Sequence, residues 1–85
     1  MYRYTFVYRA PRIRKRGRVR LIWETLSTSY KGVDDRDAVM KARRILRKSH
    51  IDFTGACSVS TAVALLVELS DGNFEPIRST ALGLR

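Results

Sequence analysis

Side chains alternate with a period of two in two segments near the start of the chain, and this pattern limits the fold more than any other feature. In residues 2–9, Tyr and Phe fill the even positions, while Arg, Thr and Val fill the odd ones. In residues 18–26, Val19, Leu21 and Trp23 share a face. Successive side chains of a strand point to opposite faces of its sheet, so both segments are predicted to be strands. Two such strands in succession predict a long hairpin.

The expected register of this hairpin stacks apolar side chains on one face and pairs opposite charges on the other. It places Tyr8 opposite Val19, Phe6 opposite Leu21, Tyr4 opposite Trp23, and Arg3 opposite Glu24. Cross-strand pairs of this kind contribute roughly 0.2–1 kcal/mol each, and a slip of one residue would move every side chain to the other face. The tip is then expected at about residues 10–17. The central aromatic residues of the first strand are expected in the core, whereas Tyr2 and Tyr8 stand at its ends and could reach solvent or a ligand.

A helix is predicted after the polar segment "STSYKG", from the helical spacing of apolar residues in "VDDRDAVMKARRILRKS". The apolar stripe consists of Ala38, Val39, Ala42, Ile45 and Leu46. Asp34 is the expected N-cap, with Asp35 and Asp37 in the first turn. Basic residues gather toward the other end. This order of charges complements the helix dipole by about 0.3–1 kcal/mol per well-placed charge.

The last third of the chain predicts a second hairpin. Residues 50–55 are expected to be a loop, and alternation then returns from Cys57 to Leu69. Asp71-Gly72 is a strong hairpin signal, although loops of two and of three residues both give acceptable pairings. A short strand of roughly residues 74–79 follows. Pro76 cannot donate a ladder hydrogen bond, so this strand belongs at an edge. A loose tail is expected from about residue 79 to residue 85.

The order strand, strand, helix, strand, strand predicts an α+β fold. With 85 residues, the chain is expected to form a single domain, residues 1–85. The economical packing is an antiparallel sheet of about four strands with one helix across one face. The expected core contains Tyr4, Phe6, Leu21, Trp23, Val63, Leu65 and Val67, packed against Val39, Ala42, Ile45 and Leu46.

Positive charge is concentrated at the first hairpin. The chain has 17 Lys or Arg against 8 Asp or Glu, a net charge of +9. The basic residues of the hairpin are Arg9, Arg12, Arg14, Lys15, Arg16, Arg18 and Arg20. In the predicted register Arg9 faces Arg18, and like charges directly opposite each other destabilise a ladder. Phosphates would neutralise this repulsion, so these residues are expected to form a nucleic-acid-binding arm. A solvated, flexible loop that only keeps the protein soluble is the structural alternative.

The outer face of the helix offers a second basic surface. Its members are Lys41, Arg43, Arg44, Arg47 and Lys48. An exposed helix face is usually charged, and cations near its C-terminal end also suit the dipole. Asp37 is expected to pair with Lys41 four residues later. The sequence leaves open whether this surface and the hairpin lie on the same side of the molecule.

The sequence therefore favours a non-catalytic nucleic-acid-binding domain, for DNA or RNA, with the hairpin as its principal contact. The alternative is a small inhibitor or adaptor of the phage or mobile-element type. Its basic arm would dock on an acidic or nucleic-acid-binding surface of a larger host enzyme or complex. This comparison rests on analogy of fold alone. A homodimer through a sheet edge is compatible with both functions.

Catalysis has little support in the sequence. His50 and Cys57 are the only residues of their kind, whereas a zinc site needs three or four ligands. Cys57 is expected on the apolar side of its strand, where a thiol is usually inert. No catalytic residue, metal or cofactor is predicted. No segment reaches the ~18 apolar residues that span a membrane, and one Cys cannot form an intrachain disulfide. We expect a cytoplasmic protein that does not bind membranes.

Overall fold

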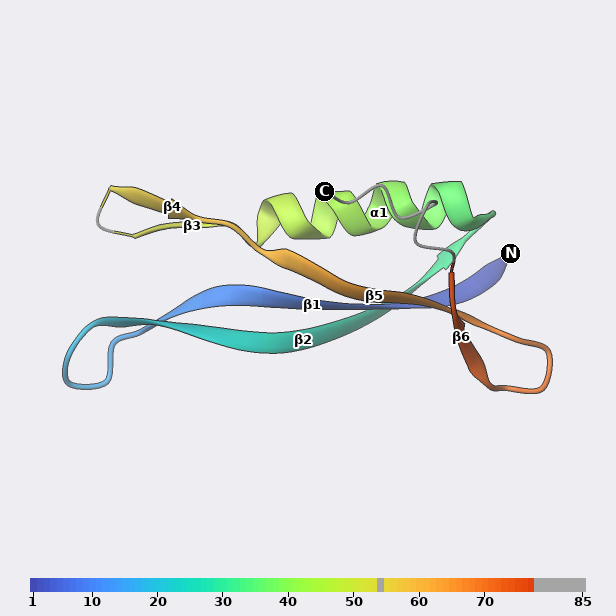
Figure 1. Cartoon of the computed structure of the whole chain (residues 1–85), viewed down its shortest axis with the longest axis horizontal. Coiled ribbons are helices and arrows are strands. Elements are labelled where there is room, and N and C mark those ends of the chain that lie inside the picture. The colour runs from blue at the N-terminus through green and yellow to red at the C-terminus, as the bar shows by residue number, and fades with distance from the viewer. Residues whose placement is uncertain (54, 78–85) are drawn as a thin grey trace.

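The computed structural model describes residues 1–53 and 55–77, which form six strands and one helix. The elements are β1 (Tyr2–Arg14), β2 (Arg20–Gly32), α1 (Asp35–Lys48), β3 (Ile51–Phe53), β4 (Ala56–Ser58), β5 (Thr61–Glu68) and β6 (Phe74–Pro76). A four-stranded sheet has the order β2-β1-β5-β6, and all its neighbouring strands are antiparallel. β3 and β4 form a separate two-stranded sheet. Figure 1 shows the long β1–β2 hairpin and the shorter β3–β4 hairpin extending toward the same end of the molecule.

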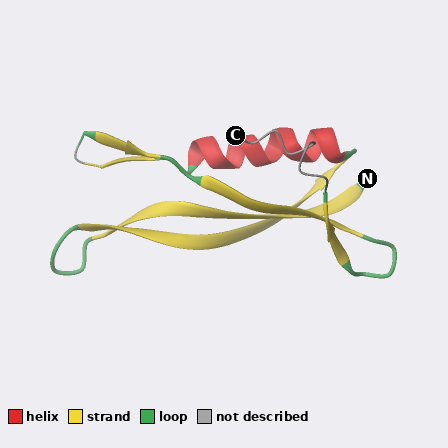
Figure 2. Cartoon of the chain, in the orientation of Figure 1, coloured by secondary structure: helices red, strands yellow, loops and turns green. Residues whose placement is uncertain are grey.

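The helix lies across one face of the four-stranded sheet, as predicted (Figure 2). Asp34 is its N-cap, and its carboxylate accepts a hydrogen bond of 2.9 Å from the backbone N–H of Asp37. Ala38, Val39 and Ala42 are buried against the sheet. Ser49 ends the helix, and its hydroxyl donates back to the carbonyl of Ile45 at 2.8 Å. The other face of the sheet has no element of the described chain over it.

The core lies between this helix and the central strands β1 and β5. Tyr4 and Phe6 of β1 have no exposed surface, and Leu65 of β5 is 1% exposed. The rings of Phe6 and Tyr8 stack with their centroids 5.2 Å apart. Tyr8 is therefore a core residue, while Tyr2, at the other end of the row, is exposed as the sequence allowed.

Two tyrosines of the sheet hold the start of the helix through their hydroxyl groups. Tyr4 donates to the Asp35 carboxylate at 2.9 Å, and Tyr30 donates to the carbonyl of Ala38 at 2.7 Å. Burial raises the pKa of Tyr30 to about 12, and the Asp37 charge adds to this effect. Burial and the hydrogen bond to Asp35 likewise raise the pKa of Tyr4 above its ordinary value. Both phenols are therefore neutral donors at physiological pH.

The predicted register of the β1–β2 hairpin is wrong. Tyr8 pairs with Leu26, Phe6 with Thr28, and Tyr4 with Tyr30. β2 is longer than expected because the segment predicted as a polar turn continues the strand to Gly32. Thr25, Ser27 and Ser29 lie on the exposed face of β2, and hydroxyl side chains are compatible with a strand that has one solvated face. The partner of Tyr8 is thus Leu26 instead of Val19, a shift of the register by an odd number of residues. Such a shift exchanges the two faces of β2, so Leu21 and Trp23 leave the predicted core.

The predicted continuous alternation of residues 57–69 is also interrupted. A bulge in β5 lies where the partner of β1 changes from Ala64, opposite Val7, to Ala62, opposite Tyr8. Val63 falls in this bulge and is exposed, although the sequence placed it in the core. A bulge adds one unpaired residue and so changes which positions face the helix. Val67 keeps its expected place beside the core.

The segment after the helix forms strands rather than the predicted loop. β3 and β4 pair as a short hairpin through Ile51 and Ser58. Cys57 is exposed on β4, so its expected place on an apolar strand face is wrong. The second predicted hairpin is confirmed; residues 69–73 connect its strands, and a 2.7 Å hydrogen bond from Leu69 N–H to Asn73 O encloses the three residues of the turn. β6, which contains Pro76, lies at the sheet edge as predicted. The predicted tail lies outside the described residues.

The observed register predicts a large difference between two aromatic substitutions. Phe6→Ala is expected to lower the free energy of unfolding by about 3–5 kcal/mol, because it empties a core position. Trp23→Ala is expected to cost less than about 1 kcal/mol, because Trp23 is exposed. Urea unfolding of both variants measures the difference. A destabilisation by Trp23→Ala equal to that by Phe6→Ala would contradict the register.

Candidate nucleic-acid interface

The β1–β2 hairpin extends beyond the four-stranded sheet as a two-stranded ribbon. β1 pairs with β5 only from Tyr4 to Arg9, and beyond Arg9 it pairs with β2 alone. We call this ribbon, residues 10–24, the arm. The molecule measures 47 × 22 × 17 Å, and the arm forms one end of its longest axis (Figure 1).

The tip of the arm is shorter than the sequence predicted. The strands run to Arg14 and Arg20, so the connection comprises residues 15–19 rather than about 10–17. Gly17 has a φ of 72°, a backbone conformation that glycine adopts without steric cost. The Arg and Lys residues of the arm are therefore divided between two ordered strands and a tight tip. The ladder fixes the spacing of the strand residues.

The positive charges of the arm are exposed and mostly lack internal partners. Arg12 lies 3.7 Å from the Glu24 carboxylate, an exposed pair of little energetic weight. Within residues 1–53 and 55–77, no ion pair or side-chain hydrogen bond engages the other basic arm residues. These are Arg14, Lys15, Arg16, Arg18 and Arg20. The arm thus presents a field of positive charge to solvent.

Two like charges face each other at the end of the ladder. Arg14 pairs directly with Arg20, and like charges in this position destabilise a hairpin. The sequence predicted such repulsion between Arg9 and Arg18, which is wrong. Arg9 instead lies at the base of the arm, opposite Thr25 of β2 and Thr61 of β5.

One member of the second predicted basic surface has a structural role. The Lys41 ammonium donates to the carbonyl of Lys31 at 2.7 Å and lies 3.2 Å from the Asp37 carboxylate. It therefore fastens the helix to the end of β2, and the predicted pair with Asp37 is confirmed. The other predicted members, Arg43, Arg44, Arg47 and Lys48, are exposed.

The C-terminal end of the helix and the arm meet at a small cleft. Lys48 and Ser49 line this cleft of about 180 Å³ together with Ala10, Pro11 and Arg12 of the arm, Leu26 of β2 and Ile51 of β3. The helix runs toward the end of the molecule from which the arm extends (Figure 1). The structure thus joins the last turn of the helix to the arm in one basic surface, which the sequence left open. Lys41 lies near the other end of that face, beside Lys31.

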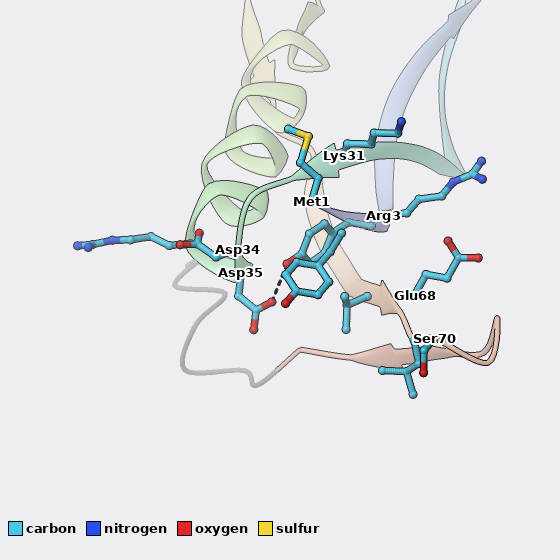
Figure 3. A pocket seen from close by; sticks show the side chains of 12 residues that line it. Met1, Arg3, Lys31, Asp34, Asp35, Glu68 and Ser70 are labelled. Carbon is cyan, nitrogen blue, oxygen red and sulfur yellow. Dashed lines mark hydrogen bonds between the residues drawn. The ribbon is translucent and has the colours of Figure 1, made fainter.

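A larger hollow lies at the end of the molecule remote from the arm (Figure 3). Its volume is about 1360 Å³, and its charged lining is mixed in sign. The charged residues are Arg3, Lys31, Arg36, Asp34, Asp35 and Glu68. The acidic side chains make it a less suitable surface for a polyanion than the arm. Asp35 is already engaged by the hydroxyl of Tyr4.

His50 bonds to the backbone, whereas Cys57 lies on the surface. The Nδ1 of His50 accepts a 3.0 Å hydrogen bond from the backbone N–H of Ser60, which ties the helix end to the start of β5. Cys57 is exposed on β4. In the part of the chain that the structure describes, no three metal-ligating side chains gather. No described helix has both the length and the apolar character needed to cross a membrane.

Comparison with protein families, with curated proteins and with solved structures gives no match. The interpretation of this surface therefore depends on its geometry and charge. The sequence did not predict that Trp23 lies on the surface of the arm, because Trp23 was assigned to the core. Thr25, Ser27 and Ser29 recur with a period of two, and this was the signal that β2 continued with these positions on its exposed face.

Asp37 predicts an acid dependence of stability. The backbone N–H of Val33, together with Lys41, lowers the pKa of Asp37 below its ordinary value. Its contribution is present above the pKa of the unfolded chain and is lost as the pH falls through the lower folded pKa. Asp37→Asn should therefore reduce the melting temperature at neutral pH and reduce the further decrease on acidification.

Thermal unfolding at pH 7 and at acid pH measures both effects. Asp52→Asn, on an exposed residue of β3, is the control. An Asp37→Asn variant with the same acid dependence as the parent would contradict this role.

Proposed function

We propose that this protein binds nucleic acid without catalysis, through the arm and the adjoining end of the helix. The observation that supports this most directly is that the positive charges of the arm are exposed and almost without carboxylate partners. Apart from the long Arg12–Glu24 contact, no described carboxylate neutralises them. Their Arg and Lys heads are exposed along a ribbon fixed by a regular ladder.

A polyanion would relieve an internal cost of this ribbon. Arg14 and Arg20 repel each other across the ladder, and a phosphate between them would be attracted to both. Each phosphate that the protein neutralises also releases condensed counterions, which strengthens binding at low salt. Arg is suited to this task because its planar guanidinium can contact a phosphate through two parallel hydrogen bonds.

The last turn of the helix would extend the same contact. Lys48 lines the cleft next to Arg12, so a backbone held at the base of the arm lies within reach of both. Arg47 neighbours Lys48 in that turn. This gives the helix a supporting role, while the arm supplies most of the charge.

Removing three charges from the end of the arm tests this function. Arg14→Ala, Lys15→Ala and Arg16→Ala in one variant should weaken binding to DNA or RNA and flatten its salt dependence. For duplex DNA the slope of log K against log salt should change by about 0.9 for each phosphate that the variant no longer neutralises. Fluorescence anisotropy with labelled duplex and single strands, over a range of salt, measures both quantities.

A matched control removes the same charge from the remote end of the molecule. Arg3→Ala, Lys31→Ala and Arg36→Ala alter three exposed residues far from the arm tip. We expect a clearly smaller decrease in affinity from this control. Equal decreases in the two variants would show that net charge alone drives binding. A flat salt slope in the parent protein would contradict the proposal.

The alternative, docking on an acidic protein surface, is separated by a second measurement. Ile13 and Val19 of the arm expose apolar surface beside the charges, which a protein partner could cover. Pull-down from a lysate treated with nuclease distinguishes the two functions. A defined acidic partner retained without nucleic acid, with no measurable affinity for DNA or RNA, would favour the alternative.

A further inference from the structure

Trp23 lies in the arm, on the face of the sheet that the helix does not cover. Tyr4, Phe6 and Tyr8 of β1 face the helix, so the odd-numbered residues of that strand face away. Trp23 is directly opposite Pro11 in the ladder and shares that outer face. Its side chain is 45% exposed. An indole ring is therefore presented on a ribbon whose other prominent residues are Arg and Lys.

The backbone position of Trp23 is fixed by its ladder partner. Pro11, directly opposite, is one of the fully buried residues of the protein and also lines the cleft beside Lys48 and Ser49. Directly opposite residues in an antiparallel ladder have their Cβ atoms about 5 Å apart, so the side chain of Trp23 begins beside Pro11. The ladder thus orders the backbone of Trp23 while nearly half of its side chain is open to solvent. A ring on an ordered backbone loses less conformational entropy when a ligand stacks on it than a ring on a mobile loop.

The charges around Trp23 are complementary to an anionic ligand. Arg9 is its diagonal neighbour across the ladder, at about 7–8 Å, and belongs to the same face. Thr25, opposite Arg9, adds a hydroxyl. Glu24 is the one acidic residue within residues 10–24, and it faces Arg12 on the helix side. The outer face near Trp23 therefore combines an aromatic surface with positive charge.

We propose that Trp23 and Arg9 form a seat for an unpaired base, with the base stacked on the indole and its phosphate near the guanidinium. This inference rests on the proposed function and names its ligand as single-stranded nucleic acid. Bases within a duplex are stacked on each other and expose no face to a side chain. Aromatic rings beside a positive groove are a general means of holding unpaired bases, since every base has a π face.

A second copy of the chain is a less suitable occupant of this face. Two copies meeting at Trp23 would bring their arms together, and each arm has Arg14, Lys15 and Arg16 near the contact. Like charges in an interface cost several kcal/mol. A strand of phosphates has the opposite sign and so fits the same surroundings.

Trp23 is the sole Trp of the chain, so its fluorescence reports the seat directly. Titration with a short oligothymidylate should quench this fluorescence, because the base stacks on the indole. A duplex of equal length that binds the arm should leave the signal largely unchanged. Light scattering on the same samples gives the mass of the free and bound protein.

Variants then separate stacking from charge. Trp23→Ala should weaken oligothymidylate binding by about tenfold, within the range expected when one base is no longer stacked. Binding to the duplex should change by less than about twofold on this interpretation. Trp23→Phe should restore part of the affinity. Phe74→Ala removes an aromatic ring of equal exposure on β6, 45%, and should leave both affinities unchanged. Circular dichroism confirms that each variant is folded.

Several results would overturn the inference. Salt-dependent binding of both nucleic acids without quenching, and without an effect of Trp23→Ala, would remove the seat but leave the proposed function intact. A parent protein whose mass rises with concentration, and falls to that of one chain in Trp23→Ala, would assign this face to a second copy. The absence of binding to any nucleic acid would remove both the seat and the proposed function.

Discussion

The pairing of Tyr4 with Tyr30 in the β1–β2 ladder determines where the other parts of the molecule lie. Their rings stack with centroids 6.3 Å apart, and each hydroxyl bonds to the first turns of the helix. The same ladder brings Gly32 so close to the ring of Tyr4 that an added Cβ would lie 3.0 Å from it. This contact sets the helix over one face of the sheet. It also sets how much of the hairpin remains beyond the sheet, because β5 pairs with β1 only as far as Arg9.

Much of this architecture was predictable from local patterns, because these patterns have local physical causes. The Asp34 cap, the apolar stripe of the helix, the turn at Gly72 and the edge position of Pro76 all depend on neighbouring residues, and all are confirmed. The register of the first hairpin was not predictable in the same way. It depends on the hydroxyls of Tyr4 and Tyr30, whose partners in the helix lie 31 and 8 residues away along the chain, and no pattern within the strands records those contacts. Pairing the largest apolar residues gave a self-consistent alternative that placed Trp23 in the core.

The candidate site shows the same division between local and long-range information. The basic residues of the arm are visible in the sequence because charge needs no partner to be recognised. Their presentation depends on the register, which sets Arg14 against Arg20 and moves Arg9 to the base of the arm. The contacts of the helix with the hairpin also distinguish two of its lysines. Lys41 donates to the carbonyl of Lys31 and has a structural role, whereas Lys48 lines the cleft with Arg12. Trp23 could not be assigned to the arm surface until the face of each β2 residue was known.

The arm is costly for so small a protein. A two-stranded ribbon in water is marginally stable without a third strand or a helix to cover it, and this ribbon adds repulsion between cations to an exposed indole. The repulsion and the exposed indole do not stabilise the core, to which the arm contributes only Ala10 and the fully buried Pro11 at its base. A ligand that is anionic along its length and aromatic at intervals would compensate both costs together, because in the proposed complex its phosphates would meet the guanidinium groups and its bases would cover the ring. Single-stranded nucleic acid has both properties in one covalent chain. The coincidence of unpaired Arg and exposed Trp on one ribbon therefore favours it over a ligand that supplies charge alone.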